Sequence, residues 1–402
     1  MPTLSSGRDY YPLFHEQNGI PFHRHIYSDL AAYRGEGPIV REKPSDGPVP
    51  AGGRWITADY ELSLEILRRT GDFRADVIVP SMWLALGNSL IFLEGERHAV
   101  LRRALRTLFT KERLVEWERR IIGPAAHAII DRFARRGAAD LVAEFTSGFP
   151  HDVFGRLMGF SAEQAEEARR CGVEILCAPT DLGLALRASE RLTRIFRGMM
   201  AERRATPTDD LTSDIVHLES EGAPLPEEDQ LCFLRLLAPA GTETTAHALA
   251  NLLVGLLSAP EQIEALRADR SLIPQAVEEA LRWETPVLRT LRRTVSPVSI
   301  GGVDLPAGAW ITVSLGGANH DERAFPDPDR FDIFRPQTAQ LAFGLGARQC
   351  LGAGLARLEL RVGLTALLDR LPGLALDHAA VAPFLSGFLF RTALSAPAVW
   401  TA

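Results

Sequence analysis

Cys350 is the cysteine of this sequence whose surroundings favour metal ligation. It lies in the segment FGLGARQCLG, residues 343–352, directly before a stretch with the pattern of a helix from Gly354 to Leu371. The glycines on both sides allow a tight bend and the close approach of a flat ligand. The start of a helix stabilises a thiolate through its free N–H groups and its dipole. A lone cysteine in a glycine loop is the alternative, but the whole FGxGxxxCxG pattern argues against it.

A second feature with chemical potential is the polar segment AGTETT, residues 240–245, within a long apolar stretch. A glycine and three threonines lower helix propensity, which favours a functional reason for their presence. The hydroxyl of Thr244 can bond a backbone carbonyl and open a local groove, and the carboxyl of Glu243 can relay protons. From these residues alone, a polar turn in a buried helix is equally consistent.

Two pairs of charged residues have helical spacing. Glu279 and Arg282 are three residues apart, and His98 and Arg102 are four apart, so each pair shares one helix face. An ion pair of the first kind is usually a weak surface contact, and the second kind is usually a solvated face. Neither pair identifies a site by itself.

Together these segments resemble the cytochrome P450 superfamily, specifically its soluble bacterial members, from about Trp55 to the C-terminus. The resemblance implies a mainly α fold with small β-sheets, a triangular prism-like domain whose long central helix lies over haem b (iron protoporphyrin IX). It implies that Cys350 is the proximal ligand of the haem iron and that Glu243 and Thr244 deliver protons to bound dioxygen. Arg348 stands where histidine is usual in the family, and a guanidinium suits a haem propionate well.

The resemblance also assigns residues around the cofactor. The propionates are expected to contact His98, Arg102, Arg292 and Arg348, and the other haem contacts are Phe343, Gly352, Ala240 and Gly241. Glu279 and Arg282 become a buried structural pair that braces the cysteine loop, with Arg335 as the third member and Arg330 as the alternative.

The expected substrate pocket is apolar, which predicts a lipophilic small-molecule substrate. Period-2 alternation on an extended segment places Leu288 and Thr290 on the face of Arg292. About half of the pocket residues are equally consistent with simple core packing. The full set is Ile78, Val79, Met82, Trp83, Leu236, Leu288, Thr290, Phe384, Leu385 and Phe388.

A helical scaffold is expected to position these side chains. Helical periodicity dominates from Ala58 to Trp283, and the segment Glu227–Ala259 is apolar on nearly every side in its second half, so it must run through the interior. Period-2 patterns occur in Val298–Ile300 and Ala309–Ser314. We expect residues 1–54 to form an N-terminal segment packed on a cytochrome P450 haem-thiolate domain of residues 55–402, one structural domain overall.

The composition restricts the partners. The 402 residues carry a formal net charge of −7 and no run of basic residues, which argues against nucleic acid. No stretch approaches the ~18 apolar residues of a membrane span, and the sequence lacks the apolar core of a signal peptide. We expect a cytoplasmic monomer without a membrane partner, and reduced, mostly buried thiols for the other cysteines, Cys171, Cys177 and Cys232.

The expected activity is insertion of one oxygen atom of dioxygen into the substrate, by hydroxylation or epoxidation. No flavin or iron–sulfur motif lies in the chain, so a redox partner must supply the electrons, and the resemblance implies a ferredoxin or flavodoxin with its own reductase. Basic residues around the cysteine can steer an acidic partner: Arg102, Arg103, Arg106, Lys111, Arg357 and Arg361. The alternatives are oxidative coupling, dehydrogenation or peroxygenation on the same scaffold, or a non-enzymatic haem-binding protein, in which Glu243 and Thr244 would have no purpose.

Overall fold

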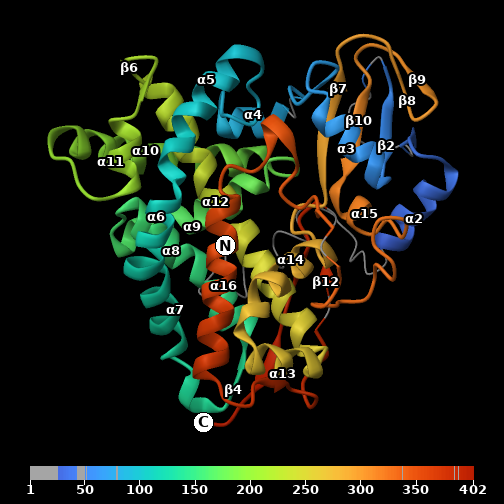
Figure 1. Cartoon of the computed structure of the whole chain (residues 1–402). Helices are drawn as coiled ribbons and strands as arrows, with labels where there is room; N and C mark the ends of the chain where they lie inside the picture. Colours follow the sequence, from blue (N-terminus) through green and yellow to red (C-terminus); the bar gives the residue numbers. More distant parts are fainter. Residues whose placement is uncertain are drawn as a thin grey trace.

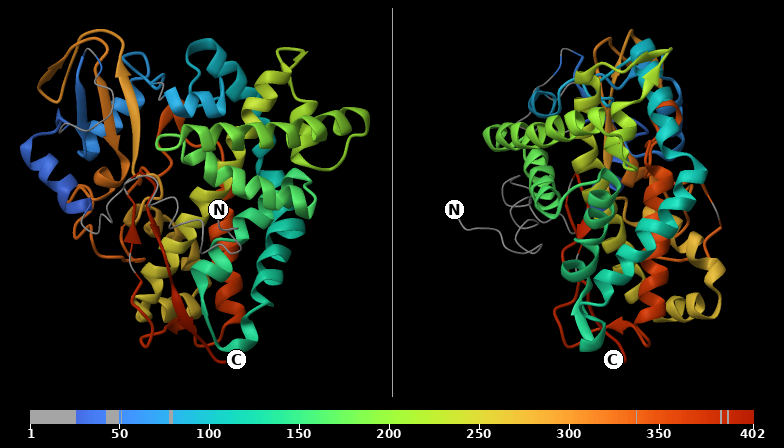
Figure 2. Two further views of the ribbon diagram at one scale, coloured as in Figure 1. Left: turned by 180° about the vertical axis from the view of Figure 1, so that it is seen from behind. Right: turned by 90° about the vertical axis from the view of Figure 1, so that its left-hand side faces the viewer.

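The structure, a computed structural model, describes residues 26–42, 50, 52–77, 80–336, 338–383, 385–387 and 389–402. Four expected pocket residues, Ile78, Val79, Phe384 and Phe388, lie outside this described part. The molecule has a triangular outline in front view and is thinner from the side, with most helices on one side and the largest sheet on the other (Figures 1 and 2). The prediction of a mainly helical fold with small sheets is confirmed.

The described helices account for most of the chain between Tyr60 and Arg370. Their bounds are α2 Ile26–Glu36, α3 Tyr60–Arg68, α4 Pro80–Leu86, α5 Gly95–Arg106, α6 Lys111–Trp117, α7 Gly123–Ile130, α8 Phe149–Met158, α9 Ala162–Leu176, α10 Leu182–Ala205, α11 Leu211–Val216, α12 Glu227–Leu257, α13 Pro260–Ala268, α14 Ile273–Trp283, α15 Leu315–Asn319 and α16 Ala353–Arg370.

The strands form one five-stranded sheet and several small ones. The large sheet has the order β1-β2-β10-β7-β3, with β10 parallel to β2 and the other pairs antiparallel. Its strands are β1 Val40–Arg41, β2 Arg54–Thr57, β3 Phe73–Arg74, β7 Arg289–Thr294 and β10 Trp310–Ser314; the small sheets hold β4 Ala138–Asp140, β5 Glu219–Ser220, β6 Ala223–Pro224, β8 Val298–Ile300, β9 Val303–Leu305, β11 Ala375–Leu376, β12 Leu385–Ser386, β13 Thr392–Ala393 and β14 Pro397–Val399.

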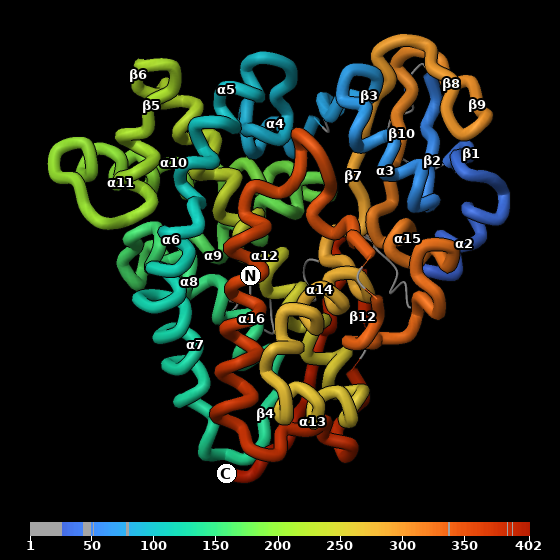
Figure 3. Tube along the Cα trace, viewed as in Figure 1, coloured from blue at the N-terminus to red at the C-terminus, as the bar shows by residue number. Residues whose placement is uncertain are grey.

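Helix α12 is the centre of the helical layer. It begins at Glu227 as predicted and ends at Leu257, two residues earlier than expected. Helices α8, α9 and α10 pack against it, as do α14 and α16, and α16 crosses it in the middle of the molecule (Figure 3). Acidic residues in its first turn interact favourably with the positive end of the helix dipole. No described helix is long and apolar enough to cross a membrane.

The threonines of α12 satisfy their hydroxyl groups within the helix. Thr242 donates to the carbonyl oxygen of Ala238 at 2.6 Å, and Thr244 donates to that of Ala240 at 2.8 Å. Each bond spans one helical turn, so a polar hydroxyl is tolerated in the interior without an external partner.

Described residues on both sides of residue 54 contribute to the same sheet. Strand β1 lies before it and pairs with β2, with Val40 opposite Ile56. Helix α2 packs on the same sheet through Ile26 and Leu30, which share a small core with Ile56 and Leu288.

Asn251 of α12 ties the end of the chain to the helical core. Its side chain is fully buried and donates to the carbonyl oxygens of Glu284 and Arg391, both at 3.0 Å, and it accepts from the N–H of Ala393 at 2.9 Å. The side chains of Glu284 and Arg391 form a buried ion pair at 2.6 Å, and the Tyr27 hydroxyl of α2 donates to the same carboxylate at 2.9 Å. Segments far apart in sequence thus converge on one polar cluster.

Replacing Asn251 with alanine should lower the free energy of unfolding by about 3 kcal/mol, because three buried backbone groups lose their partner. Urea denaturation of the holoprotein, followed by circular dichroism, measures the change. The control is Asn88→Ala, an exposed asparagine with one hydrogen bond to Trp83, for which we expect a change within about 0.5 kcal/mol. Equal midpoints for the two variants would contradict the role of Asn251.

Candidate functional site

The cysteine loop is built from turns that only glycine adopts easily. Gly344 and Gly346 have φ values of 65° and 71°, in the left-handed region. The chain then turns back, so that the N–H of Cys350 donates to the carbonyl oxygen of Phe343 at 2.8 Å. Helix α16 begins three residues later at Ala353, after the N-cap residue Gly352. The sulfur of Cys350 therefore lies at the start of a long helix, as predicted.

The environment of the Cys350 thiol differs from the expectation that the start of the helix stabilises a thiolate. The side chain of Cys350 is exposed, but desolvation by the surrounding protein raises the pKa of its thiol, and this effect exceeds the lowering by the N–H groups of Gly352 and Ala353 and by the charges of Arg102 and Arg357. The helix terminus alone therefore does not make the free thiol a thiolate. A metal cation deprotonates a coordinating thiol outright, so bound iron would supply the missing stabilisation.

The side chain of Phe343 lies in the same loop. It is partly buried, and the guanidinium of Arg357 stands 4.4 Å from the centre of its ring. Arg357 in turn forms an ion pair with Glu278 of α14 at 2.5 Å. The loop is thus held both by its own turns and by contacts from α14 and α16.

The described residues of α12 that were expected to face the cofactor are the more accessible ones of that helix. Ala240 is exposed although Ala238 and Pro239 before it are buried, and Gly241 and Thr244 are partly exposed. An accessible alanine in the middle of a buried helix indicates that no other described part of the protein packs against the helix at this position. That observation fits a bound group beside this turn.

Four basic side chains from three separate segments are electrostatically coupled. Burial lowers the pKa of His98 to about 4, assisted by the charges of Arg348 and Arg102. Burial and the charge of Arg348 lower the pKa of Arg292 to about 10. These four residues were expected to bind the propionates, and the structure brings them together.

Few anions compensate this cluster in the described part of the chain. Arg348 pairs with Glu94 at 2.6 Å, and Arg102 donates to the carbonyl oxygen of Gln349. The buried Nε of Arg292 has no hydrogen-bond partner. An unpartnered guanidinium nitrogen among mutually repelling cations fits an anionic group, and a dianionic haem supplies one beside the cysteine sulfur.

Glu243 is buried and faces helix α8. The Nε2 atom of His151 lies 2.8 Å from its Oε1 atom. Burial by itself raises the pKa of Glu243, but His151, His247 and Arg169 lower it, and the net shift is downward. His151 was not expected from the sequence, because it has no motif of its own and lies 92 residues before its partner.

Glu279 joins α14 to the loop that precedes the cysteine segment. Arg282 binds both of its carboxylate oxygens at 2.8 Å, and Nε of Arg335 lies 3.3 Å from Oε1. The side chain of Arg330, the alternative third member, pairs with Asp332 instead and is two-thirds exposed. The geometry therefore favours Arg335 over Arg330.

The described pocket residues fall into two groups. Met82 and Trp83 on α4, Thr290 on β7 and Leu385 on β12 are partly exposed, whereas Leu236 on α12 is buried in the core. Thr290 shares a face with Arg292, since the guanidinium donates to its hydroxyl at 3.0 Å.

The position of Leu288 differs from the expectation that it shares a face with Thr290 and Arg292. Its side chain is buried among Ile26, Leu30 and Ile56 and does not accompany Thr290. The reason is that β7 begins at Arg289, so strand alternation does not extend back to Leu288.

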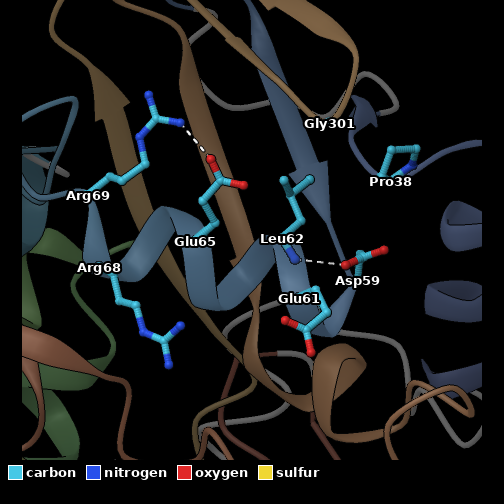
Figure 4. Close-up of a pocket in the computed structure, with 8 residues that line it drawn as sticks. All are labelled: Pro38, Asp59, Glu61, Leu62, Glu65, Arg68, Arg69 and Gly301. Carbon is cyan, nitrogen blue, oxygen red and sulfur yellow. Dashed lines mark hydrogen bonds and ion pairs between the residues drawn. The ribbon is translucent and has the colours of Figure 1, made fainter.

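A surface hollow of about 510 Å³ lies along α3, away from the cluster described above (Figure 4). Five of its eight lining residues are charged: Asp59, Glu61, Glu65, Arg68 and Arg69. Glu65 pairs with Arg69 at 2.6 Å, and Asp59 accepts from the N–H of Leu62 at 2.8 Å. It offers no feature that an apolar ligand requires.

The chain was compared with known proteins. A family model described as Cytochrome P450 matches residues 186–373. Cytochrome P450 107B1 of Saccharopolyspora erythraea is 37% identical over 290 residues, which cover 72% of this chain and 71% of the relative. The chain belongs to the cytochrome P450 family. Cytochrome P450 monooxygenase PikC of Streptomyces venezuelae is 35% identical over 367 residues, 89% of this P450 and 87% of the relative.

Solved structures agree with this assignment. Cytochrome P450 CYP109Q5 from Chondromyces apiculatus has a TM-score of 0.84 and 30% identity, covering 94% of this chain and 96% of that one. This P450 is therefore a haem-thiolate monooxygenase with iron protoporphyrin IX as its cofactor. The predicted family, fold, cofactor and enzyme class are confirmed.

Replacing Cys350 with serine should abolish the red-shifted Soret band of the reduced, carbon-monoxide-bound protein, because that band requires thiolate ligation. Cys177→Ser is the matched control, because Cys177 is a buried cysteine at the end of α9 whose thiol bonds to the carbonyl oxygen of Val173, outside the FGxGxxxCxG segment. The absorbance spectra of both variants, taken with haem content, check the result. A red-shifted band in Cys350→Ser would exclude Cys350 as the ligand.

Proposed function

We propose that Cys350 ligates the haem iron and that this P450 inserts one oxygen atom of dioxygen into a lipophilic small molecule, by hydroxylation or epoxidation. The observation that carries the proposal is the incompletely compensated basic cluster next to the cysteine at the start of α16, in which the buried Nε of Arg292 has no hydrogen-bond partner. His98, Arg102, Arg292 and Arg348 would bind the propionates. Phe343 and Gly352 would lie on the proximal side, and Ala240 and Gly241 on the distal side.

Bound haem would supply the activation of dioxygen, which the thiolate favours by donating electron density to the iron. The residues of this chain would do the remaining work. Glu279, Arg282 and Arg335 would hold the cysteine loop and thereby keep the cofactor in place. Their proposed role is structural, because their polar atoms bond to each other and to backbone groups of the chain between α15 and the cysteine loop.

Thr244 and Glu243 are proposed as the catalytic pair for proton delivery. The Thr244 hydroxyl donates to the carbonyl oxygen of Ala240, which leaves its lone pairs free to accept a proton donor. Ala240 is exposed on the same turn, so the hydroxyl lies next to the accessible side of α12. Glu243 is adjacent in sequence and carries the only carboxylate of this segment, residues 240–245.

Replacing Thr244 with alanine should reduce product formation by about 10²-fold, at the low end of what a positioned proton-transfer group contributes. Electron consumption should continue, with release of hydrogen peroxide. Thr242→Ala is the control, since Thr242 makes the same bond to a backbone carbonyl but is buried. The ratio of product to electrons consumed measures the effect. Intact coupling in Thr244→Ala would refute the proton-delivery role.

The substrate is proposed to lie between α4 and α12. Met82 and Trp83 of α4 are partly exposed, and Thr290 and Leu385 complete the described lining. These side chains present no unpaired charge, which favours a lipophilic molecule. Product analysis with labelled dioxygen separates insertion from coupling or dehydrogenation, because only insertion retains the label.

The proposed electron donor is an acidic ferredoxin or flavodoxin with its own reductase. Arg103, Arg106 and Lys111 on α5 and α6 are exposed, as is Arg361 on α16. A local basic surface of this kind steers an acidic protein despite the net charge of −7. We also propose a cytoplasmic monomer in which residues 1–54 pack on one domain of residues 55–402.

The double variant Arg103→Glu, Arg106→Glu should slow reduction by an acidic ferredoxin by about tenfold at low ionic strength, and less in high salt. Stopped-flow reduction of the carbon-monoxide-bound protein measures the rate. The matched control is Arg132→Glu with Arg135→Glu, two exposed arginines after α7. Equal rates for both double variants would place the docking surface elsewhere.

A further inference from the structure

The geometry of the pair formed by His151 and Glu243 restricts which of its atoms can carry a proton. His151 is the third residue of α8, and its Nδ1 atom lies 2.8 Å from the carbonyl oxygen of Ser147. A carbonyl oxygen only accepts, so Nδ1 must carry a hydrogen. The other ring nitrogen, Nε2, faces Oε1 of Glu243 at 2.8 Å.

One proton is therefore needed between Nε2 and Oε1. Either the imidazole is doubly protonated beside a carboxylate, or a singly protonated imidazole accepts from a carboxylic acid. Without that proton, two lone pairs would face each other at hydrogen-bond distance. The downward shift of the pKa of Glu243 favours the carboxylate, and the geometry then requires the proton on Nε2 of His151.

The pair also connects the interior with the surface. The side chain of Glu243 is 5% exposed and that of His151 is 10% exposed, so the histidine is the outer member. Glu243 immediately precedes Thr244 on α12, and α8 packs directly against α12. The charged or titratable groups that face Glu243 besides His151 are His247, one turn further along α12, and Arg169 of α9.

We propose that His151 is a positioning residue that stores the proton delivered through Glu243 and Thr244. This inference rests on the proposed function of those two residues. The proton moves from Nε2 of His151 to Oε1 of Glu243, which leaves a neutral imidazole and a carboxylic acid. The acid then rotates towards Thr244 and passes the proton on, and solvent at the outer edge of α8 reprotonates Nε2.

Two substitutions should change coupling in different ways: one lowers it at every pH, and the other shifts its pH profile. His151→Arg keeps a positive partner that releases no proton, so Glu243 stays ionised and the product-to-electron ratio should fall by about tenfold at all pH values. His151→Gln removes the positive partner, and since burial raises the pKa of Glu243, the acid holds its own proton to higher pH. Its alkaline decline in coupling should therefore shift upwards relative to the wild type.

His217→Gln is the matched control. Its Nδ1 atom lies 2.8 Å from the carbonyl oxygen of Ser213, the same bond one turn back that His151 makes, but it is exposed and not paired with Glu243. It should keep the wild-type profile. The measurement is the product-to-electron ratio of each holoenzyme against pH, with the carbon monoxide spectrum verifying that haem and fold are intact.

The outcomes separate the two proposals. Wild-type protein without a thiolate spectrum or without oxygen insertion would overturn the proposed function. An active wild type whose profile is unchanged in both His151 variants would overturn the proton store alone. If only one His151 variant retains haem, its product-to-electron ratio against pH decides. The change stated above for that variant supports the proton store, and a wild-type profile overturns it.

Discussion

The carboxylate of Glu279 holds two guanidinium groups in the interior, and the path of the chain towards Cys350 depends on that contact. Arg282 also donates to the carbonyl oxygens of Asn319 and Pro328, and Arg335 donates to that of Asp327. Removing one partner from such a cluster would leave an uncompensated buried charge, at a cost of about 3–5 kcal/mol. Apart from the bond to Asn319 at the end of α15, these bonds hold irregular backbone between α15 and α16, so the chain that leads to the cysteine loop is held in place.

On this base the chain arranges charge unevenly. Its net charge of −7 conceals an inner basic cluster of His98, Arg102, Arg292 and Arg348, in which burial and mutual repulsion act together. Such a cluster destabilises the protein until an anion neutralises it. Haem binding would therefore stabilise the folded protein as well as supply its chemistry.

The distal side follows a different principle. The hydroxyl groups of α12 bond to the carbonyl oxygens one turn back, and the carboxyl of Glu243 turns to His151 on α8. Helix continuity is therefore preserved although AGTETT is a poor helix sequence. Here the buried contact of Glu243 with His151 and the accessible Ala240 lie within one turn of each other, so the proposed proton supply lies beside the space proposed for ligands.

Much of this architecture could be predicted from local pattern. The bounds of α12 and α16, the glycine turns at Cys350 and the pairing of Glu279 with Arg282 depend on residues close in sequence, where spacing and conformational preference act directly. The sequence by itself determined the family, the cofactor and the chemistry class, because the relevant groups lie in short motifs.

Contacts between distant segments were decided only by the tertiary structure. The choice of Arg335 over Arg330, the burial of Leu288 against α2, the bonds of Asn251 and the pairing of His151 with Glu243 each join segments dozens to hundreds of residues apart. Likewise the pKa of the Cys350 thiol depends on the desolvation that the surrounding fold imposes, which outweighs the helix terminus. The periodicity of a sequence predicts which face of a helix or strand is buried. The packing of the fold decides which side chains from other segments contact that face.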